Sequence, residues 1–117
     1  MKSNKKNRIC LEKIIFYCDE LDMILKKHSY KKDEFMSSAE MQYACGMCIV
    51  QIGELVSNLD DEFKAINNEV PWRVIKATRN IYVHQYGSVD LDQVWNTITE
   101  NIPTLKKQLK DILCKIM

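Results

Sequence analysis

The chain has 117 residues, a hydrophobic fraction of 46% and a formal net charge of +1 at pH 7. This length suits one domain, and this composition excludes an intrinsically disordered chain. Because the net charge is close to zero, attraction to nucleic acid would have to come from a local basic face. We expect a single domain over residues 1–117, in which residues 1–7 form a frayed basic arm.

The sequence indicates a cytoplasmic protein without a membrane segment. The longest apolar run, residues 44–50, is too short to span a bilayer, and no apolar signal region follows the basic N-terminus. Five cysteines, an odd number without a paired framework, indicate reduced thiols. Cys45 and Cys48 have the spacing of a redox or zinc half-site, but neither a second cysteine pair nor a preceding strand accompanies them. We expect both in a helical core, and we predict no metal site and no cofactor.

Apolar residues at helical spacing predict the first two long helices. The first stripe, which ends near His28, consists of Leu11, Ile14, Cys18, Leu21 and Leu25. The second stripe consists of Met41, Cys45, Cys48, Ile52, Leu55 and Leu59. Ser37 and Glu40 predict a capping box at the start of the second helix. Gly46 and Gly53, two turns apart on this helix, would destabilise it unless they let a neighbouring helix approach closely.

Three further elements follow. A short helix is expected from about Asp61 to Asn67, with Asp60 as its cap. Pro71 suits the first turn of a third long helix, which Gly87 ends. Asp90 opens the last helix, whose apolar stripe is Leu91, Val94, Ile98, Ile102, Leu105, Leu109, Ile112 and Ile116. This stripe continues past Pro103, which should kink the helix or begin a new segment in line with it. The predicted architecture is all-α: an up-and-down bundle of four long helices plus a short helix.

The third long helix has two different faces at about 100° per residue. The face predicted to meet the core carries Val74, Ile75, Thr78, Ile81 and Tyr82. The opposite face carries Arg73, Lys76, Arg79, Asn80 and His84 around Val83. A basic, hydrogen-bonding face around an exposed valine suggests a surface that contacts RNA, a partner or a second copy of the chain. The alternative is a solvated helix face, with His84 near a helix C-terminus that favours its protonated form.

Arg79, His84 and Tyr86 have the spacing Arg-x4-His-x-Tyr. This motif resembles that of HEPN-domain proteins, in particular the HepT-like ribonuclease toxins. Three segments in the same order resemble that family: QIGELVSNL at the end of the second long helix, VPWRVIKATRNIYVHQYGSVD around the motif, and VWNTITENIPTLKKQL in the last helix. The similarity extends from about Ile9 to Leu113, without a departure at the motif positions.

The resemblance implies a HEPN-like bundle, an obligate two-fold homodimer and metal-independent cleavage of RNA. It also implies a toxin whose partner is a small nucleotidyltransferase antitoxin. In some members of the family that partner transfers AMP to the tyrosine of the motif, which is Tyr86 in this chain.

The chemistry of RNA cleavage gives these residues specific roles. Without a metal, a base must take the proton of the 2′-hydroxyl and an acid must protonate the leaving 5′-oxygen, and histidine can serve as either near neutral pH. In a two-fold dimer, two copies of His84 around one cleft would supply both groups. Arg79 would hold the scissile phosphate, with Arg73 and Lys76 in support. Asn80 would orient His84 or hydrogen-bond the phosphate, and Tyr86 would stack a base or bond to phosphate. Val83 would lie in the interface. The expected product is a 2′,3′-cyclic phosphate, and DNA is not expected as a substrate.

Two other functions remain open. In the main alternative, the chain is a non-catalytic partner subunit of a nucleotidyltransferase and binds a nucleotide phosphate or substrate with Arg79 and His84. In the other, it is a plain dimeric scaffold. RNA cleavage by purified protein in EDTA distinguishes the enzyme from both.

Overall fold

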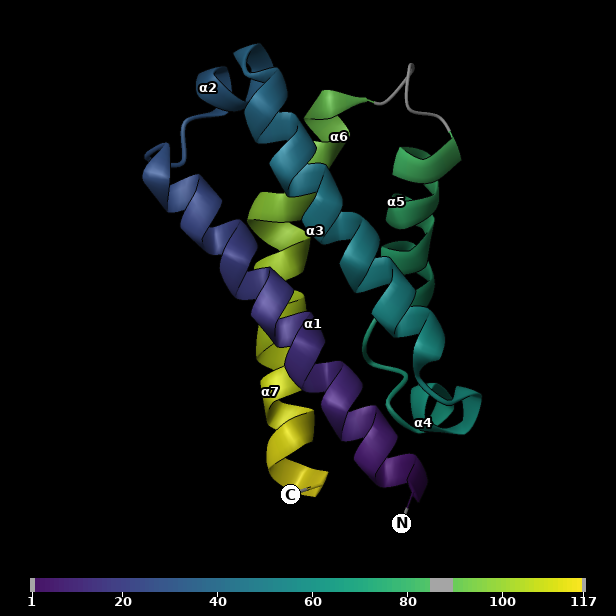
Figure 1. Ribbon diagram of the computed structural model, residues 1–117. Coiled ribbons are helices and arrows are strands. Elements are labelled where there is room, and N and C mark those ends of the chain that lie inside the picture. Colours follow the sequence, from purple (N-terminus) through teal and green to yellow (C-terminus); the bar gives the residue numbers. More distant parts are fainter. Residues whose placement is uncertain (1, 85–89, 117) are drawn as a thin grey trace.

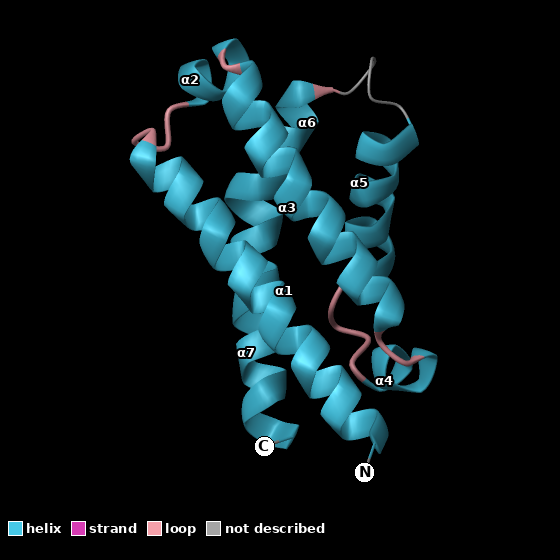
Figure 2. Ribbon diagram, in the orientation of Figure 1, coloured by secondary structure: helices cyan, strands magenta, loops and turns pink. Residues whose placement is uncertain are grey.

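The computed structural model describes residues 2–84 and 90–116, with the side chains of residues 5–80 and 90–116 (Figure 1). Its elements are α1 (Lys2–Lys27), α2 (Lys32–Ser37), α3 (Ala39–Asn58), α4 (Asp61–Ile66), α5 (Trp72–His84), α6 (Leu91–Asn96), the π-helical segment η2 (Thr97–Asn101) and α7 (Ile102–Ile116). Every element within these ranges is a helix (Figure 2), which confirms the predicted all-α class.

The long helices form an up-and-down bundle. α1, α3, α5 and the continuous segment α6–η2–α7 run in alternating directions, so that the start of α1 and the end of α7 lie at the same end of the molecule (Figure 1). α3 is central: it packs against α1 on one side and against α5 on the other. α1 also packs against α7. None of the helices in the described ranges has the length and apolar character needed to cross a membrane.

The predicted apolar stripes form the core. All five residues of the first stripe are buried, and in the second only Leu55 is half-buried. In the last stripe the six residues from Val94 to Ile112 are buried, Leu91 is half-buried, and Ile116 is exposed at the end of α7. Cys45 and Cys48 are both buried, as expected for core residues. The periodicity therefore located the inner faces of α1, α3 and α7 correctly.

The start of α3 differs by one residue from the prediction. Ser38, rather than Ser37, is the N-cap, and its hydroxyl oxygen accepts a hydrogen bond from the backbone N–H of Met41 at 3.1 Å. Ser37 instead ends the unpredicted helix α2, where its hydroxyl donates to the carbonyl of Asp33 at 2.9 Å. α2 covers one end of the core because its Phe35 is fully buried, with its ring 5.5 Å from that of Trp95.

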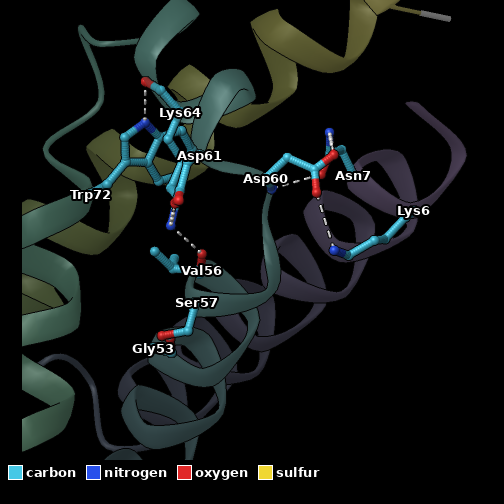
Figure 3. A network of polar contacts seen from close by, with 9 residues as sticks. All are labelled: Lys6, Asn7, Gly53, Val56, Ser57, Asp60, Asp61, Lys64 and Trp72. Atoms are coloured by element: carbon cyan, nitrogen blue, oxygen red, sulfur yellow. Dashed lines mark hydrogen bonds and ion pairs between the residues drawn. The ribbon is translucent and has the colours of Figure 1, made fainter. Parts of the chain in front are cut away.

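The N-terminal segment also differs from the expected frayed arm, because α1 already begins at Lys2. Asn7 is 2% exposed and donates to the Asp60 carboxylate at 3.3 Å, while its own side-chain oxygen accepts from the Asp60 backbone N–H at 3.2 Å. Lys6 approaches the same carboxylate at 3.2 Å (Figure 3). Asp60 does occupy the N-cap position of α4, but its side chain makes no capping bond there. Instead it ties the start of α1 to the connection between α3 and α4.

The last helix begins as predicted and is interrupted near its proline. The Asp90 carboxylate accepts from the backbone N–H groups of Asp92 and Gln93 at 3.1 and 3.3 Å, which confirms it as the cap of α6. Pro103 lies in the first turn of α7, directly after η2. Proline lacks the N–H that an α-helix would use, and a π-helical turn accommodates that loss while the helix continues in line. The predicted new segment at Pro103 is therefore confirmed.

Candidate functional site

The start of α5 is anchored to α4 through Trp72. The carbonyl of Pro71 accepts the first bonds of α5, from the N–H groups of Val74 and Ile75 at 3.1 and 3.2 Å, so the proline immediately precedes the helix. The Trp72 indole N–H is shared between the carbonyls of Lys64 and Asn67 at 3.2 and 3.1 Å (Figure 3 shows the bond to Lys64). Because the indole is also only 9% exposed, it fixes where α5 begins.

The inner face predicted for α5 is only partly confirmed, because Ile75 is buried as expected but its predicted neighbours are not. Val74, expected in the core, is 55% exposed, and Thr78 is only half-buried. The residues that turn inward are Trp72, Ile75 and Arg79, which are spaced three and four apart and therefore share one side of the helix. α5 packs mainly against α3 rather than over the centre of the bundle, so its inner face is rotated from the most apolar arc. Ile81 and Tyr82 have side chains outside the described residues.

Gly53 on α3 explains how an arginine fits against a neighbouring helix. A Cβ atom placed at Gly53 would lie 2.3 Å from the Cβ and 2.5 Å from the Cγ of Arg79. These distances are far below van der Waals contact, so the stem of Arg79 occupies the space that a side chain at position 53 would need. The predicted close helix approach is confirmed at Gly53, and the neighbour is α5.

The guanidinium group of Arg79 is held by two side chains from different helices. Its Nη1 donates to Oδ1 of Asn80 at 2.8 Å, and its Nη2 donates to the carboxylate of Glu54 on α3. The Nε atom is buried, and it has no hydrogen-bond partner among the described residues. The Arg79 side chain is 24% exposed. Arg79 was predicted on an open outer face, but it lies instead at the α3–α5 junction, where its side chain is only partly exposed.

Sequence reasoning named both Arg79 and Asn80 but predicted neither the hydrogen bond between them nor the contact with Glu54. The available signal was its position directly after Gly53, within the QIGELVSNL segment. The predicted residues His84, Val83 and Tyr86 lack a described environment: α5 ends at His84, the side chains of Val83 and His84 lie outside the described residues, and Tyr86 lies outside them altogether. The roles assigned to these three stay predictions.

A basic recess lies at the start of α5, where α4, the connection that follows it and the end of α3 meet. It has a volume of about 540 Å³ and is lined by Lys64, Arg73 and Lys76 together with Val56, Ala65, Asn68, Val70, Pro71 and Trp72. Arg73 and Lys76 are exposed, and the Lys64 ammonium donates to the carbonyl of Val56 at 3.3 Å (Figure 3). The lining contains three cations and, among the described residues, no carboxylate. Arg73 and Lys76 precede Arg79 on α5 by about two turns and one turn, respectively, and their role in binding phosphate stays a prediction.

The fold and this arginine-centred junction define a small all-α protein of the HEPN type. The family model described as Ribonuclease HepT-like matches residues 13–112, and the chain belongs to this family, as its motif predicted. The chain is 35% identical over 111 residues to "Putative RNase TTE0752" of Caldanaerobacter subterraneus subsp. tengcongensis, a match that covers 95% of this chain and 97% of that protein. It is 31% identical over 80 residues to "Probable ribonuclease HepT" of Thermococcus cleftensis, which covers 68% of this chain and 73% of that protein. No solved structure matches the chain significantly.

Proposed function

We propose that the protein is a metal-independent endoribonuclease toxin that acts at the cleft of a homodimer and is neutralised by a partner nucleotidyltransferase antitoxin. The observation that carries this proposal is the Arg79 guanidinium, fixed at the α3–α5 junction on the helix that ends with His84. Family membership and the ribonuclease names of two relatives support the same activity. RNA, rather than DNA, is the proposed substrate.

In this mechanism Arg79 binds the scissile phosphate and stabilises the charge that develops on it. One copy of His84 takes the proton of the 2′-hydroxyl, and the copy from the second protomer donates a proton to the leaving 5′-oxygen. The 2′-oxygen attacks the phosphorus as the bond to the 5′-oxygen breaks, which leaves a 2′,3′-cyclic phosphate and a 5′-hydroxyl. Asn80 restrains Arg79 through its side-chain oxygen.

The basic recess provides a path for the rest of the RNA strand. The exposed Arg73 and Lys76 offer positive charge to backbone phosphates, whereas Lys64 is already paired with Asp61 at 3.7 Å. The Trp72 indole is almost fully buried and its N–H is already bonded within the protein, so we do not assign it a base-stacking role. Contacts of this kind give affinity that depends on salt but little on base sequence.

Arg79→Ala and His84→Ala test the proposal in an RNA cleavage assay with EDTA present. Each variant should lose activity, and for His84→Ala the loss should be a factor of roughly 10² to 10⁴, the usual contribution of proton transfer. Arg8→Ala and His28→Ala on and beside α1 are matched controls that should retain full activity. Full activity of His84→Ala, or loss of wild-type cleavage in EDTA, contradicts the mechanism. Nucleotide binding without cleavage would favour the non-catalytic partner subunit.

A further inference from the structure

Glu54 contacts Arg79 from a different helix, 25 residues away in the chain. Its carboxylate accepts a hydrogen bond from Nη2, while Asn80 on α5 accepts from Nη1. The two terminal nitrogens of one guanidinium are thus each bonded to a separate acceptor. Glu54 is 47% exposed and Arg79 is 24% exposed, so the pair lies at the edge of the junction rather than in the core.

These contacts fix the plane of the guanidinium. A guanidinium group is planar and presents five N–H donors in a rigid fork, so two bonds to its terminal nitrogens define its orientation. Its stem has little freedom, because Cβ and Cγ lie over Gly53. Each terminal nitrogen carries two N–H groups, and among the described residues the bonds to Asn80 and Glu54 use one on each.

We propose that Glu54 is a positioning residue that holds Arg79 in the orientation in which it meets the scissile phosphate. This inference rests on the proposed ribonuclease function. A carboxylate beside a phosphate site opposes the binding of RNA, because both groups are negatively charged. Its contribution therefore lies in orientation: a guanidinium that is already fixed does not have to reorganise as charge develops on the phosphate.

This role predicts that substitution of Glu54 lowers kcat without raising KM. Glu54→Ala removes both the charge and the acceptor, so kcat should fall by roughly 10- to 100-fold, the range expected when a positioned group is misplaced by about 1 Å. Glu54→Gln keeps an acceptor oxygen and should lose less. KM for RNA should stay unchanged or fall in both variants, since a negative charge has been removed. Glu20→Gln, a half-buried glutamate on α1, is the matched control and should change neither constant.

A double-mutant cycle shows whether Glu54 acts through Arg79. In the Arg79→Ala background, adding Glu54→Ala should cause no further loss of kcat, because the group being positioned is already absent. A purely structural role for Glu54 predicts losses that multiply instead. Circular dichroism and Tm measurements confirm that each variant is folded at the assay temperature.

The outcomes separate the two hypotheses. If the wild type cleaves RNA and Arg79→Ala is strongly impaired, but Glu54→Ala keeps full kcat or raises KM, the positioning role is overturned while the proposed function stands. Multiplicative losses in the cycle overturn it as well. If the wild type cleaves no RNA, the proposed function fails and this inference fails with it.

Discussion

Three cysteine thiols lie in surroundings that oppose their ionisation. Burial raises the pKa of Cys18 and of Cys45 to about 12 and that of Cys48 to about 11, mainly because a thiolate loses its hydration there. Since the thiolate is the reactive form, these residues should resist thiol reagents. At pH 8, a colorimetric thiol reagent should react rapidly with the exposed Cys114 alone, and with all five thiols after denaturation. A fast-reacting thiol that persists in Cys114→Ser would contradict this expectation.

The same shifts make stability depend on pH. In the unfolded chain these thiols ionise near their ordinary value of 9.0, whereas in the folded protein they keep their protons up to a pKa of about 11 to 12. Between these values the unfolded state binds fewer protons, so the free energy of unfolding falls as the pH rises. The stability that the protonated buried thiols contribute is fully present below about pH 9, and it is lost progressively up to about pH 12. Tm measured from pH 8 to pH 10 should fall more steeply for the wild type than for Cys45→Ala.

Tyr86 is the residue predicted to accept AMP from the partner nucleotidyltransferase. It falls between the end of α5 and the start of α6 in the chain, outside the described residues. Tyr86 belongs to the same short motif as Arg79 and His84. An adenylate on its hydroxyl would add a negative phosphodiester and a bulky base to that motif. The negative charge would repel RNA, and the base would obstruct its binding. After co-expression with the partner, mass spectrometry should find one adenylate group on the Tyr86 peptide.

Two variants serve as controls for this modification. Tyr86→Phe should abolish the adenylate, and Tyr82→Phe should leave it in place. An unmodified Tyr86 peptide in a neutralised toxin would mean that the partner inhibits by binding alone.

At the scale of elements, Gly53 determines how closely α5 can approach α3. Gly53→Ala should add about 1 kcal/mol of helix propensity to α3. However, the new Cβ would meet the Cβ of Arg79, which cannot swing aside as the far end of a side chain could. Overpacking of this kind costs about 1–3 kcal/mol. We therefore expect a net loss of stability and, because Arg79 moves with α5, a loss of RNA cleavage.

Thermal unfolding measures this effect. A net loss of about 1 kcal/mol corresponds to a fall in Tm of roughly 4 °C or more for a domain of this size. Asn58→Ala, at an exposed position on the same helix, raises helix propensity without touching Arg79 and should not lower Tm. If Gly53→Ala melted at or above the wild-type temperature, the close approach would not be a constraint on the fold.

The helices also show which features the sequence could predict. α1, α3 and α7 bury apolar stripes in a shared core, so their inner faces followed from periodicity alone. α5 packs mainly on α3, and one of its inward residues is Arg79, whose apolar stem packs while its charged head bonds at the edge. An analysis of hydrophobic periodicity that treats arginine as polar places Arg79 on the solvent-facing side of α5. α2 was missed because only Phe35 in its six residues is buried.

The candidate site was only partly predictable for a related reason. Arg79 and Asn80 followed from a local motif, which needs no knowledge of packing. Glu54 and Lys64 join the site only through the way α3 and α4 pack beside α5, and residue spacing along the chain does not contain that information. The predicted N-cap of α3 was one residue too early, because either of the adjacent serines, Ser37 or Ser38, could have capped the helix.

At the scale of the whole molecule, the fold leaves α5 open on one side. The protein measures 46 × 28 × 20 Å, and its smallest dimension is about two helix diameters. A bundle only two helices deep covers α5 with α3 but leaves Val74 of α5 55% exposed, and Met47 on α3 is 60% exposed. Exposed apolar surface of this kind is typical of a protein interface.

We predict a homodimer whose interface includes Val83 and places the two copies of His84 around one cleft. The physical reasons are the open side of α5 and the need for both an acid and a base, which a single His84 cannot supply. Light scattering at micromolar concentration should give the mass of two chains. Val83→Glu would bury a charge in the interface, so it should yield the monomer and abolish RNA cleavage. Met23→Glu, at a 63% exposed position on α1, should change neither property. A wild-type mass equal to one chain would exclude the two-histidine cleft, and with it the acid–base mechanism proposed for His84.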